Sequence, residues 1–144
     1  MAEPKRLLAA REHLSQAEAR LRSEEGLFHL EEGLALLEEV MSGEASEFRS
    51  VARNLGIAYS TKICGTVKEL VETDSALPEP DLEHFFKMVL AFDERGFELP
   101  EHARSTKINL ARRLVDRYYE GYSAEEKQAA LEQLAEISKQ RPRR

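Results

Sequence analysis

The four histidines, His13, His29, His84 and His102, are the side chains best suited to bind a metal ion or to transfer a proton. A zinc-binding helix of the His-Glu-x-x-His type would place two of them four residues apart, and that motif is absent from the sequence. A carboxylate-bridged di-iron site in a helical bundle would need paired Glu-x-x-His motifs. The nearest sequence, Asp81-Leu-Glu-His84, occurs once. We therefore expect no metal site and no cofactor.

Cys64 is the only cysteine and the one candidate for a strong nucleophile. Its neighbours, Ile63 and Gly65, offer neither a base nor a positive charge to activate the thiol, so we expect a small buried hydrophobic residue. One cysteine also excludes an intramolecular disulfide, which fits a reducing compartment. The sequence contains no phosphate-binding glycine loop and no Gly-x-Ser-x-Gly elbow. The sequence contains no motif that indicates a particular reaction, and we expect no catalytic residue.

Tyrosines and arginines, which are enriched at the energetic centres of protein interfaces, gather in one short segment. The candidate partner-binding residues there are Arg113, Arg117, Tyr119 and Tyr122. On one continuous helix Tyr118 and Tyr122 would share a face, while Tyr119 would point about 100° away. The alternative is that these tyrosines are half-buried, with their hydroxyl groups in water.

The composition of the whole chain favours one helical domain. The 144 residues are 42% hydrophobic and 33% charged, and tryptophan is absent. The net charge of −6 argues against a general affinity for nucleic acid, because such binding depends on neutralising phosphates. The sequence also has neither a signal-peptide core nor a run of 18 apolar residues, so we expect a soluble, cytoplasmic protein that does not enter a membrane.

Apolar residues recur at steps of three and four in successive segments, which predicts about six helices within residues 1–138. The apolar stripes run from Leu7 to Leu21, Leu27 to Met41, Phe48 to Leu70, Leu82 to Phe92 and Ile108 to Tyr118, and a last helix spans Ser123 to about Lys139. Whether residues 45–73 form one helix or two, divided at Gly65, stays open. Residues 139–144 form a basic tail, interpreted as a solvated terminus, with contact to phosphates as the alternative.

Local signals mark several helix ends. Ser23, followed by two glutamates, begins the second helix, and Gly43 ends it in the left-handed conformation. Two prolines within residues 75–80 predict a loop, after which Asp81 is the expected N-cap of the fourth helix. Ser123-Ala-Glu-Glu126 has the pattern of a capping box and starts the last helix.

The sequence also resembles itself at an offset of 55 residues. Residues 34–39 are similar to 89–94, and residues 49–56 are similar to 104–111, without gaps. A true duplication would give two stacked helical hairpins, with the first and last helices covering the ends. The alternative, that unrelated amphipathic helices resemble one another, stays open. In both cases the expected fold is all-α, with antiparallel hairpins stacked as a bundle or a short α-solenoid.

The segment Asn54-Leu55-Gly56-Ile57-Ala58-Tyr59 resembles the Leu-Gly-x-x-Tyr core of a tetratricopeptide helix, in which the small residue lets the partner helix approach closely. Pro80 falls where that family places its closing proline. Lys68, Glu72 and Ser75 depart from the family, which has small or aromatic residues at those positions. The resemblance therefore implies a relative built from helical hairpins rather than a regular repeat protein.

The resemblance also implies a ligand groove along one helix face. The residues of that face step by three and four and are Ser50, Arg53, Ile57 and Ser60. The alternative is the solvated side of an amphipathic helix.

We predict a non-enzymatic helical module, a scaffold or adaptor, that binds another protein or a second copy of itself. Two alternatives stay open. One is a small helical enzyme or ligand carrier with an interior pocket near His84, His102 or Tyr59, and the other is a nucleic-acid accessory protein that uses the basic tail.

Overall fold

The computed structural model describes residues 3–43, 45–74, 76–97 and 99–140, with side chains described as far as Leu134. These residues form six helices and no strand, which confirms the predicted all-α fold. The helices are α1 (Lys5–Ala19), α2 (Glu24–Gly43), α3 (Ser46–Thr73), α4 (Glu79–Glu94), α5 (Glu101–Tyr118) and α6 (Ala124–Gln140). None of the described helices combines the length and the apolar composition that crossing a bilayer requires.

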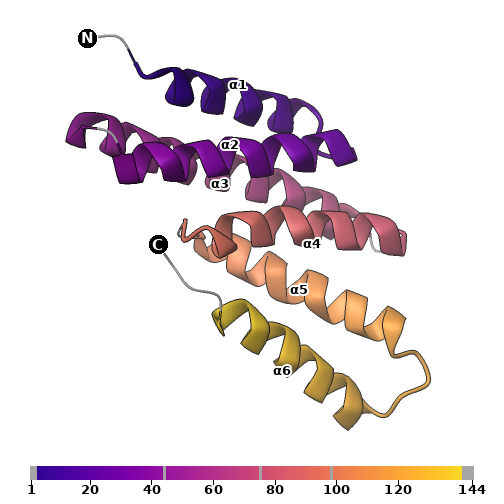
Figure 1. Ribbon diagram of the computed structural model, residues 1–144. Coiled ribbons are helices and arrows are strands. Elements are labelled where there is room, and N and C mark those ends of the chain that lie inside the picture. Colours follow the sequence, from indigo (N-terminus) through magenta and orange to yellow (C-terminus); the bar gives the residue numbers. More distant parts are fainter. Residues whose placement is uncertain (1–2, 44, 75, 98, 141–144) are drawn as a thin grey trace.

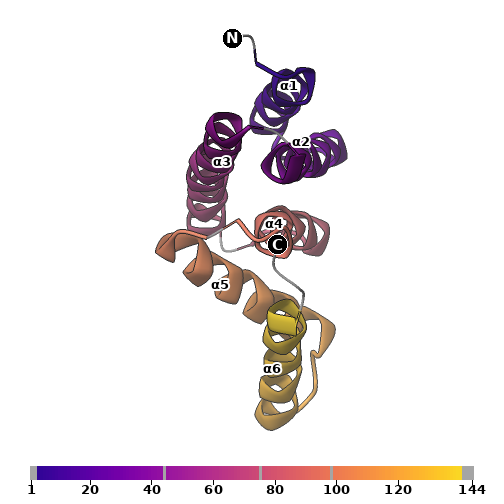
Figure 2. The ribbon, with the colours of Figure 1, turned by 60° about the vertical axis from the view of Figure 1, so that its left-hand side comes forward.

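The helices stack as two antiparallel hairpins with one further helix at each end (Figure 1). Helices α2 and α3 form the first hairpin, and α4 and α5 form the second. Between the hairpins, α2 packs on α4 and α3 packs on α5, so the stack has two layers (Figure 2). Helix α1 covers α2 at one end, and α6 packs mainly on α5 at the other. This is the stacked-hairpin arrangement expected from the sequence.

The 55-residue internal similarity has a counterpart in the helix boundaries. Helix α2 starts at Glu24 and α4 starts at Glu79, while α3 starts at Ser46 and α5 starts at Glu101. Both pairs of starts are 55 residues apart, and each helix packs on its counterpart in the other hairpin. The two hairpins therefore agree in the order and spacing of their helix starts, although α3 has 28 residues and α5 has 18. A common origin remains a prediction.

Two of the predicted helix starts are confirmed by their hydrogen bonds. The Ser123 hydroxyl accepts from the backbone N–H of Glu126 at 3.2 Å, and the Glu126 carboxylate accepts from the Ser123 hydroxyl at 3.0 Å. The Ser23 hydroxyl accepts from the backbone N–H of Gly26 at 3.1 Å, immediately before α2. Both serines satisfy backbone donors that a helix leaves unpaired in its first turn.

Other predicted boundaries are wrong or resolved differently. Asp81 is not an N-cap, because α4 already begins at Glu79 with Pro80 in its first turn, where a missing backbone N–H costs nothing. Gly43 stays helical, and the glycines with positive φ among the described residues are Gly96 and Gly121. Helix α3 is continuous through Gly65. Helix α6 reaches Gln140, two residues beyond the predicted domain end, and tail residues 141–144 lie outside the described range.

One predicted apolar stripe is only partly buried. Ile108 and Tyr118 of α5 are 52% and 51% exposed, contrary to the prediction. The buried residues of α5 are Ala103, Thr106, Leu110, Ala111, Leu114 and Val115. Helix α5 contacts α3, α4 and α6 through this side, and Ile108 lies about 160° around the helix from Leu110. Ile108 therefore faces solvent although its spacing fits an apolar stripe.

Candidate interaction surface

The helix face that the tetratricopeptide resemblance implies is only partly accessible. Ser50 and Arg53 are exposed on α3, and Ile57 is 42% exposed. Ser60 is fully buried, so its assignment to an exposed face was wrong. It lies one turn after Gly56 and so shares the side of α3 that packs inward.

The inward position of Gly56 depends on its lack of a side chain. A Cβ atom there would overlap the ring of Phe97, which is buried against α3 from the α4–α5 connection. Gly56 thus allows a close approach to α3, as in the family that it resembles. The element that approaches is the α4–α5 connection, through Phe97. Gly56 faces Phe97, and the next residue, Ile57, stays exposed beside this contact.

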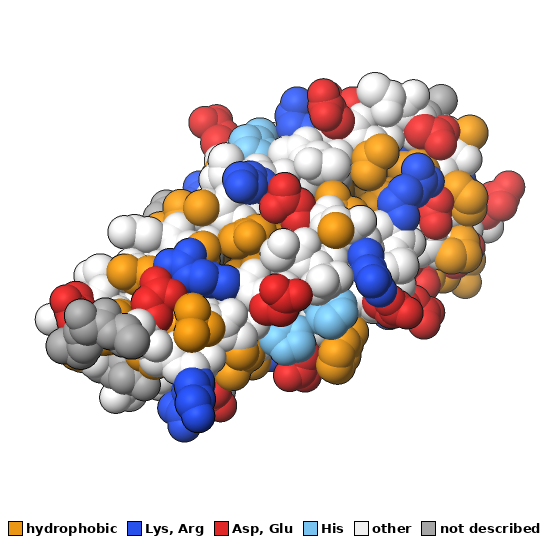
Figure 3. Space-filling view, turned by 90° about the horizontal axis from the view of Figure 1, so that it is seen from above, with side chains coloured by type: hydrophobic (Ala, Val, Ile, Leu, Met, Phe, Trp, Pro, Cys, Tyr) orange, Lys and Arg blue, Asp and Glu red, His pale blue; other side chains and the backbone are white. Residues whose placement is uncertain are grey.

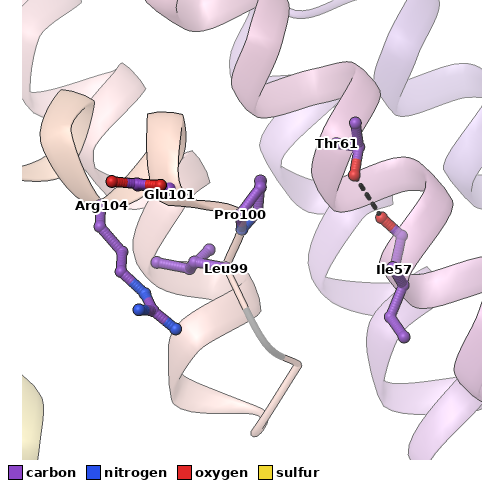
Figure 4. Close-up of a pocket in the computed structure, with 6 residues that line it drawn as sticks. All are labelled: Ile57, Thr61, Leu99, Pro100, Glu101 and Arg104. Carbon is purple, nitrogen blue, oxygen red and sulfur yellow. Dashed lines mark hydrogen bonds between the residues drawn. The ribbon is translucent and has the colours of Figure 1, made fainter.

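Ile57 lines a hollow of about 340 Å³ between α3 and the start of α5 (Figure 4). Its lining residues are Ile57, Thr61, Leu99, Pro100, Glu101 and Arg104. The Thr61 hydroxyl donates to the Ile57 carbonyl at 3.1 Å, so it is satisfied within its own helix. Arg53 lines a different hollow, beside Glu38 and Arg95, which form an ion pair at 2.6 Å. The predicted face therefore divides into two separate surfaces.

Arg113 and Arg117 both bind backbone carbonyl groups at the end of α3 and in the α3–α4 connection. Arg113 donates to the carbonyl groups of Val71 and Asp74, each at 3.1 Å, and Arg117 donates to the Leu77 carbonyl at 2.6 Å. The last carbonyls of a helix lack partners within the helix and attract cations. Arg113 thus caps α3, and both arginines hold the α3–α4 connection against α5. These contacts occupy donors that a partner would otherwise use.

Tyr119 and Tyr122 come together because α5 ends early. The helix stops at Tyr118, and the rings of Tyr119 and Tyr122 meet edge to face with centroids 5.1 Å apart. The prediction that Tyr118 and Tyr122 share a helical face is wrong, since Tyr122 lies in the turn that follows.

Tyr118 and Tyr119 line the largest hollow described here, of about 560 Å³. We call it the α4–α6 groove, and its lining residues are Glu83, Phe86, Lys87, Leu114, Val115, Tyr118, Tyr119, Ala130, Gln133 and Leu134. Its floor comes from α5 and its walls from α4 and α6. Most of its surface is apolar, and Glu83, Lys87 and Gln133 supply polar groups. Residue type alone singled out Tyr119 in the sequence, but the groove depends on how α6 packs on α5 and could not be predicted.

Cys64 is buried, as predicted. Burial raises the pKa of its thiol to about 12, and the Ser60 hydroxyl one turn earlier opposes part of that rise. The thiolate that a nucleophile requires is thus strongly disfavoured.

Among the histidines, His84 donates a hydrogen bond from Nε2 to the Leu21 carbonyl at 2.6 Å. This bond connects α4 to the α1–α2 connection. His13 and His29 lie side by side, with their Nδ1 atoms 2.9 Å apart. Sequence analysis missed this pair, because residues 16 positions apart on two helices form no motif. Neither His84, His102 nor Tyr59 lines any of the three hollows described above.

Comparison of the chain with models of protein families, with curated proteins and with solved structures found no match in any of the three.

Proposed function

We propose that this protein is a helical interaction module, a scaffold or adaptor, that binds an amphipathic helix of a partner protein in the α4–α6 groove. The observation that carries the proposal is an open apolar groove on a helix stack, lined by two tyrosines and by Phe86. An apolar groove between helices is the usual seat for the apolar face of a partner helix.

The residue types of the groove support an interface. Tyrosine is enriched among residues that contribute most to binding, and such residues gather in apolar pockets with a polar rim. Here Tyr118 is half exposed, Phe86 and Leu134 are half-buried, and Glu83 and Lys87 lie at the edge. A partner helix that covers these side chains would remove their apolar surface from water.

A carrier of a small apolar ligand is a second candidate for the same groove. The volume of about 560 Å³ lies within the range of small-molecule sites, roughly 300–1,000 Å³. Such sites surround most of the ligand surface, whereas this groove is partly open to solvent. The open shape favours a helix over a small molecule.

A photo-crosslinking experiment tests the proposal with a matched control on the same helix. A photoreactive phenylalanine replaces Tyr118 in one variant and Ile108 in another, because the two residues are equally exposed on different sides of α5. We expect a discrete crosslinked partner protein, or a crosslinked dimer, from position 118 alone. Equal crosslinking from both positions, or none from position 118, would contradict the proposal.

Once a partner is identified, a binding measurement sharpens the test. We expect Tyr118→Ala to weaken binding by roughly 30-fold, the effect of losing one dominant interface residue, whereas Ile108→Ala should leave the affinity unchanged. If a small apolar ligand instead stabilises the protein in a thermal-shift screen and competes with no protein, the carrier function is favoured.

The tetratricopeptide resemblance of residues 54–59 stays a separate proposal. It would place a partner along Ser50, Arg53 and Ile57 of α3, outside the groove. Loss of crosslinking from position 118 together with crosslinking from position 57 would favour that surface.

A further inference from the structure

His13 of α1 and His29 of α2 face each other across the first helix pair. Their Nδ1 atoms are 2.9 Å apart, their ring centroids are 5.2 Å apart, and the rings are tilted by 36°. Figure 3 shows two histidine side chains in contact on the surface of the molecule, beside exposed hydrophobic side chains. In this arrangement one ring donates its Nδ1–H and the other accepts with its Nδ1 lone pair.

Small residues at the α1–α2 interface bring the two rings together. A Cβ atom at Gly33 would lie 2.9 Å from Cγ of Leu14 and 3.3 Å from Cβ of His13, so a side chain at Gly33 would push α1 away. Leu14 and Leu30, which follow the two histidines directly, are fully buried and anchor both backbones. The position of the pair is therefore set by the packing of α1 on α2.

The spacing of the two nitrogens matches the distance between neighbouring ligands of a transition-metal ion. Two metal–nitrogen bonds of about 2.0–2.1 Å at a right angle place the nitrogens roughly 2.8–3.0 Å apart, whereas a tetrahedral angle requires roughly 3.3–3.4 Å. Right-angled coordination is typical of Cu²⁺ and Ni²⁺, and both ions prefer imidazole ligands. To bind an ion through both Nδ1 atoms, the donating ring loses its Nδ1–H to solvent and carries a proton on Nε2 instead. The ion then lies to one side of the line that joins the two nitrogens, because two bonds of about 2.0–2.1 Å do not fit along 2.9 Å.

We propose that His13 and His29 bind a divalent transition-metal ion, Cu²⁺ and Ni²⁺ in preference to Zn²⁺. Within the part of the chain that the structure describes, no group of three or more His, Cys, Asp or Glu residues forms a metal-binding set, so water completes the coordination. Phe28, whose ring packs edge-on against both imidazoles and is 55% exposed, borders the site. The ion crosslinks α1 to α2. This site is independent of the α4–α6 groove.

Calorimetric titration of the full chain without an affinity tag tests the proposal, with CuCl2, NiCl2 and ZnCl2 added in a buffer that does not bind metals. We expect one ion per chain, with affinity in the order Cu²⁺, Ni²⁺, Zn²⁺. His13→Gln and His29→Gln should each weaken Ni²⁺ binding by about tenfold or more, since each removes one ligand. His84→Gln and His102→Gln remove the same group elsewhere and should leave the affinity unchanged.

Two further measurements use the unaltered protein, so they remain informative if a variant fails to fold. The electron paramagnetic resonance spectrum of the Cu²⁺ complex should show coupling to two imidazole nitrogens. Saturating Ni²⁺ should raise the melting temperature, because the ion binds the folded chain and joins two helices. Absence of binding, binding that survives in the His13→Gln/His29→Gln double variant, or a spectrum with one nitrogen would overturn the proposal.

Discussion

The helices at the two ends of the stack, α1 and α6, bury their apolar residues to different extents. Leu7, Ala10, Leu14 and Ala17 of α1 are all fully buried against α2. Of the α6 side chains that the structure describes, Ala130 alone is buried. The apolar stripe of α1 is therefore packed more completely than the described part of α6.

The cause lies in the helix that each end helix covers. Helix α2 presents Gly26 and Gly33 to α1, and both glycines are buried at positions where a Cβ atom would meet α1 or the chain that follows it. Helix α5 presents Leu114 and Tyr118 on the side of α6, and these large side chains border the groove. Small residues allow two helices to pack closely, and large side chains at a helix end hold them apart. The α1 end therefore contributes more to the buried core, and the α6 end carries the groove to which we assign the proposed function.

The largest expected difference between the two ends is in the free energy of unfolding lost when a leucine of α1 or of α6 is replaced by alanine. We expect Leu14→Ala to destabilise the protein by about 2–5 kcal/mol, because it removes a fully buried side chain and leaves a cavity. Leu134→Ala in α6 should cost roughly 1 kcal/mol, because Leu134 is only half-buried. Denaturant unfolding followed by circular dichroism measures both. Equal losses would show that α6 packs as tightly as α1.

A glycine pair within α2 tests close packing directly. Gly33→Ala should destabilise the protein by about 1–3 kcal/mol, because the added Cβ meets the buried Leu14. Gly43→Ala is the matched control in the same helix, since nothing lies within 4 Å of its Cβ position. It should be neutral or stabilising by up to about 1 kcal/mol through helix propensity. Similar melting temperatures for the two variants would contradict the role given to Gly33.

Cys64 is buried in α3, between the two ends of the stack, and it should make the stability of the whole stack depend on pH. Its pKa is raised from 9.0 to about 12 by burial, so between these values the unfolded chain releases a proton that the folded chain keeps. Stability should therefore fall as the pH rises above 9, by at most about 1.4 kcal/mol per pH unit.

The Cys64→Ala variant isolates this contribution, because tyrosines and lysines remain in both proteins. Unfolding measured from about pH 8 to pH 10.5 should show a steeper loss for the unaltered chain. The rate of Cys64 alkylation distinguishes opening of α6 alone from unfolding of the whole stack. Opening of α6 alone should leave Cys64 protected, so alkylation should follow unfolding of the whole stack and not of α6.

The smallest expected effect concerns the start of α6. Ser123→Ala removes a capping box and should cost about 1 kcal/mol. Ser42→Ala, whose hydroxyl bonds only to carbonyls within its own helix, should change stability by less than about 0.5 kcal/mol. Hydrogen exchange should show faster opening of α6 in the Ser123 variant, with α1 unchanged. Faster exchange in both end helices would mean that the stack unfolds as one unit.

Local signals predicted most of the fold, and contacts between helices decided the rest. The Ser123 capping box and the Ser23 start depend on residues three apart, so the sequence reveals them directly. Asp81 was misassigned because proline interrupts a helix but is accepted in its first turn. Ile108 was misassigned because spacing predicts an apolar face without showing which neighbours cover it.

The candidate sites were less predictable than the helices. Tyr119 was identified from residue type, yet the groove that it lines requires the placement of α6 on α5. Arg113 and Arg117 were predicted to bind a partner, whereas the structure shows them bound to carbonyls about 40 residues earlier in the chain. These contacts depend on the stacking of the two hairpins, which the sequence does not reveal. The His13–His29 pair depends on the register of α1 against α2, which Gly33 controls.

The contacts of Arg113 and Arg117 have a mechanical consequence. They join the second hairpin to the carbonyls of Val71, Asp74 and Leu77, which lie at the joint where the first hairpin ends. Bending at this joint would break three hydrogen bonds from charged donors, which are stronger than those between neutral groups. The two hairpins should therefore move as one rigid unit, so that a load applied to α5 reaches α3 without bending at the connection between them.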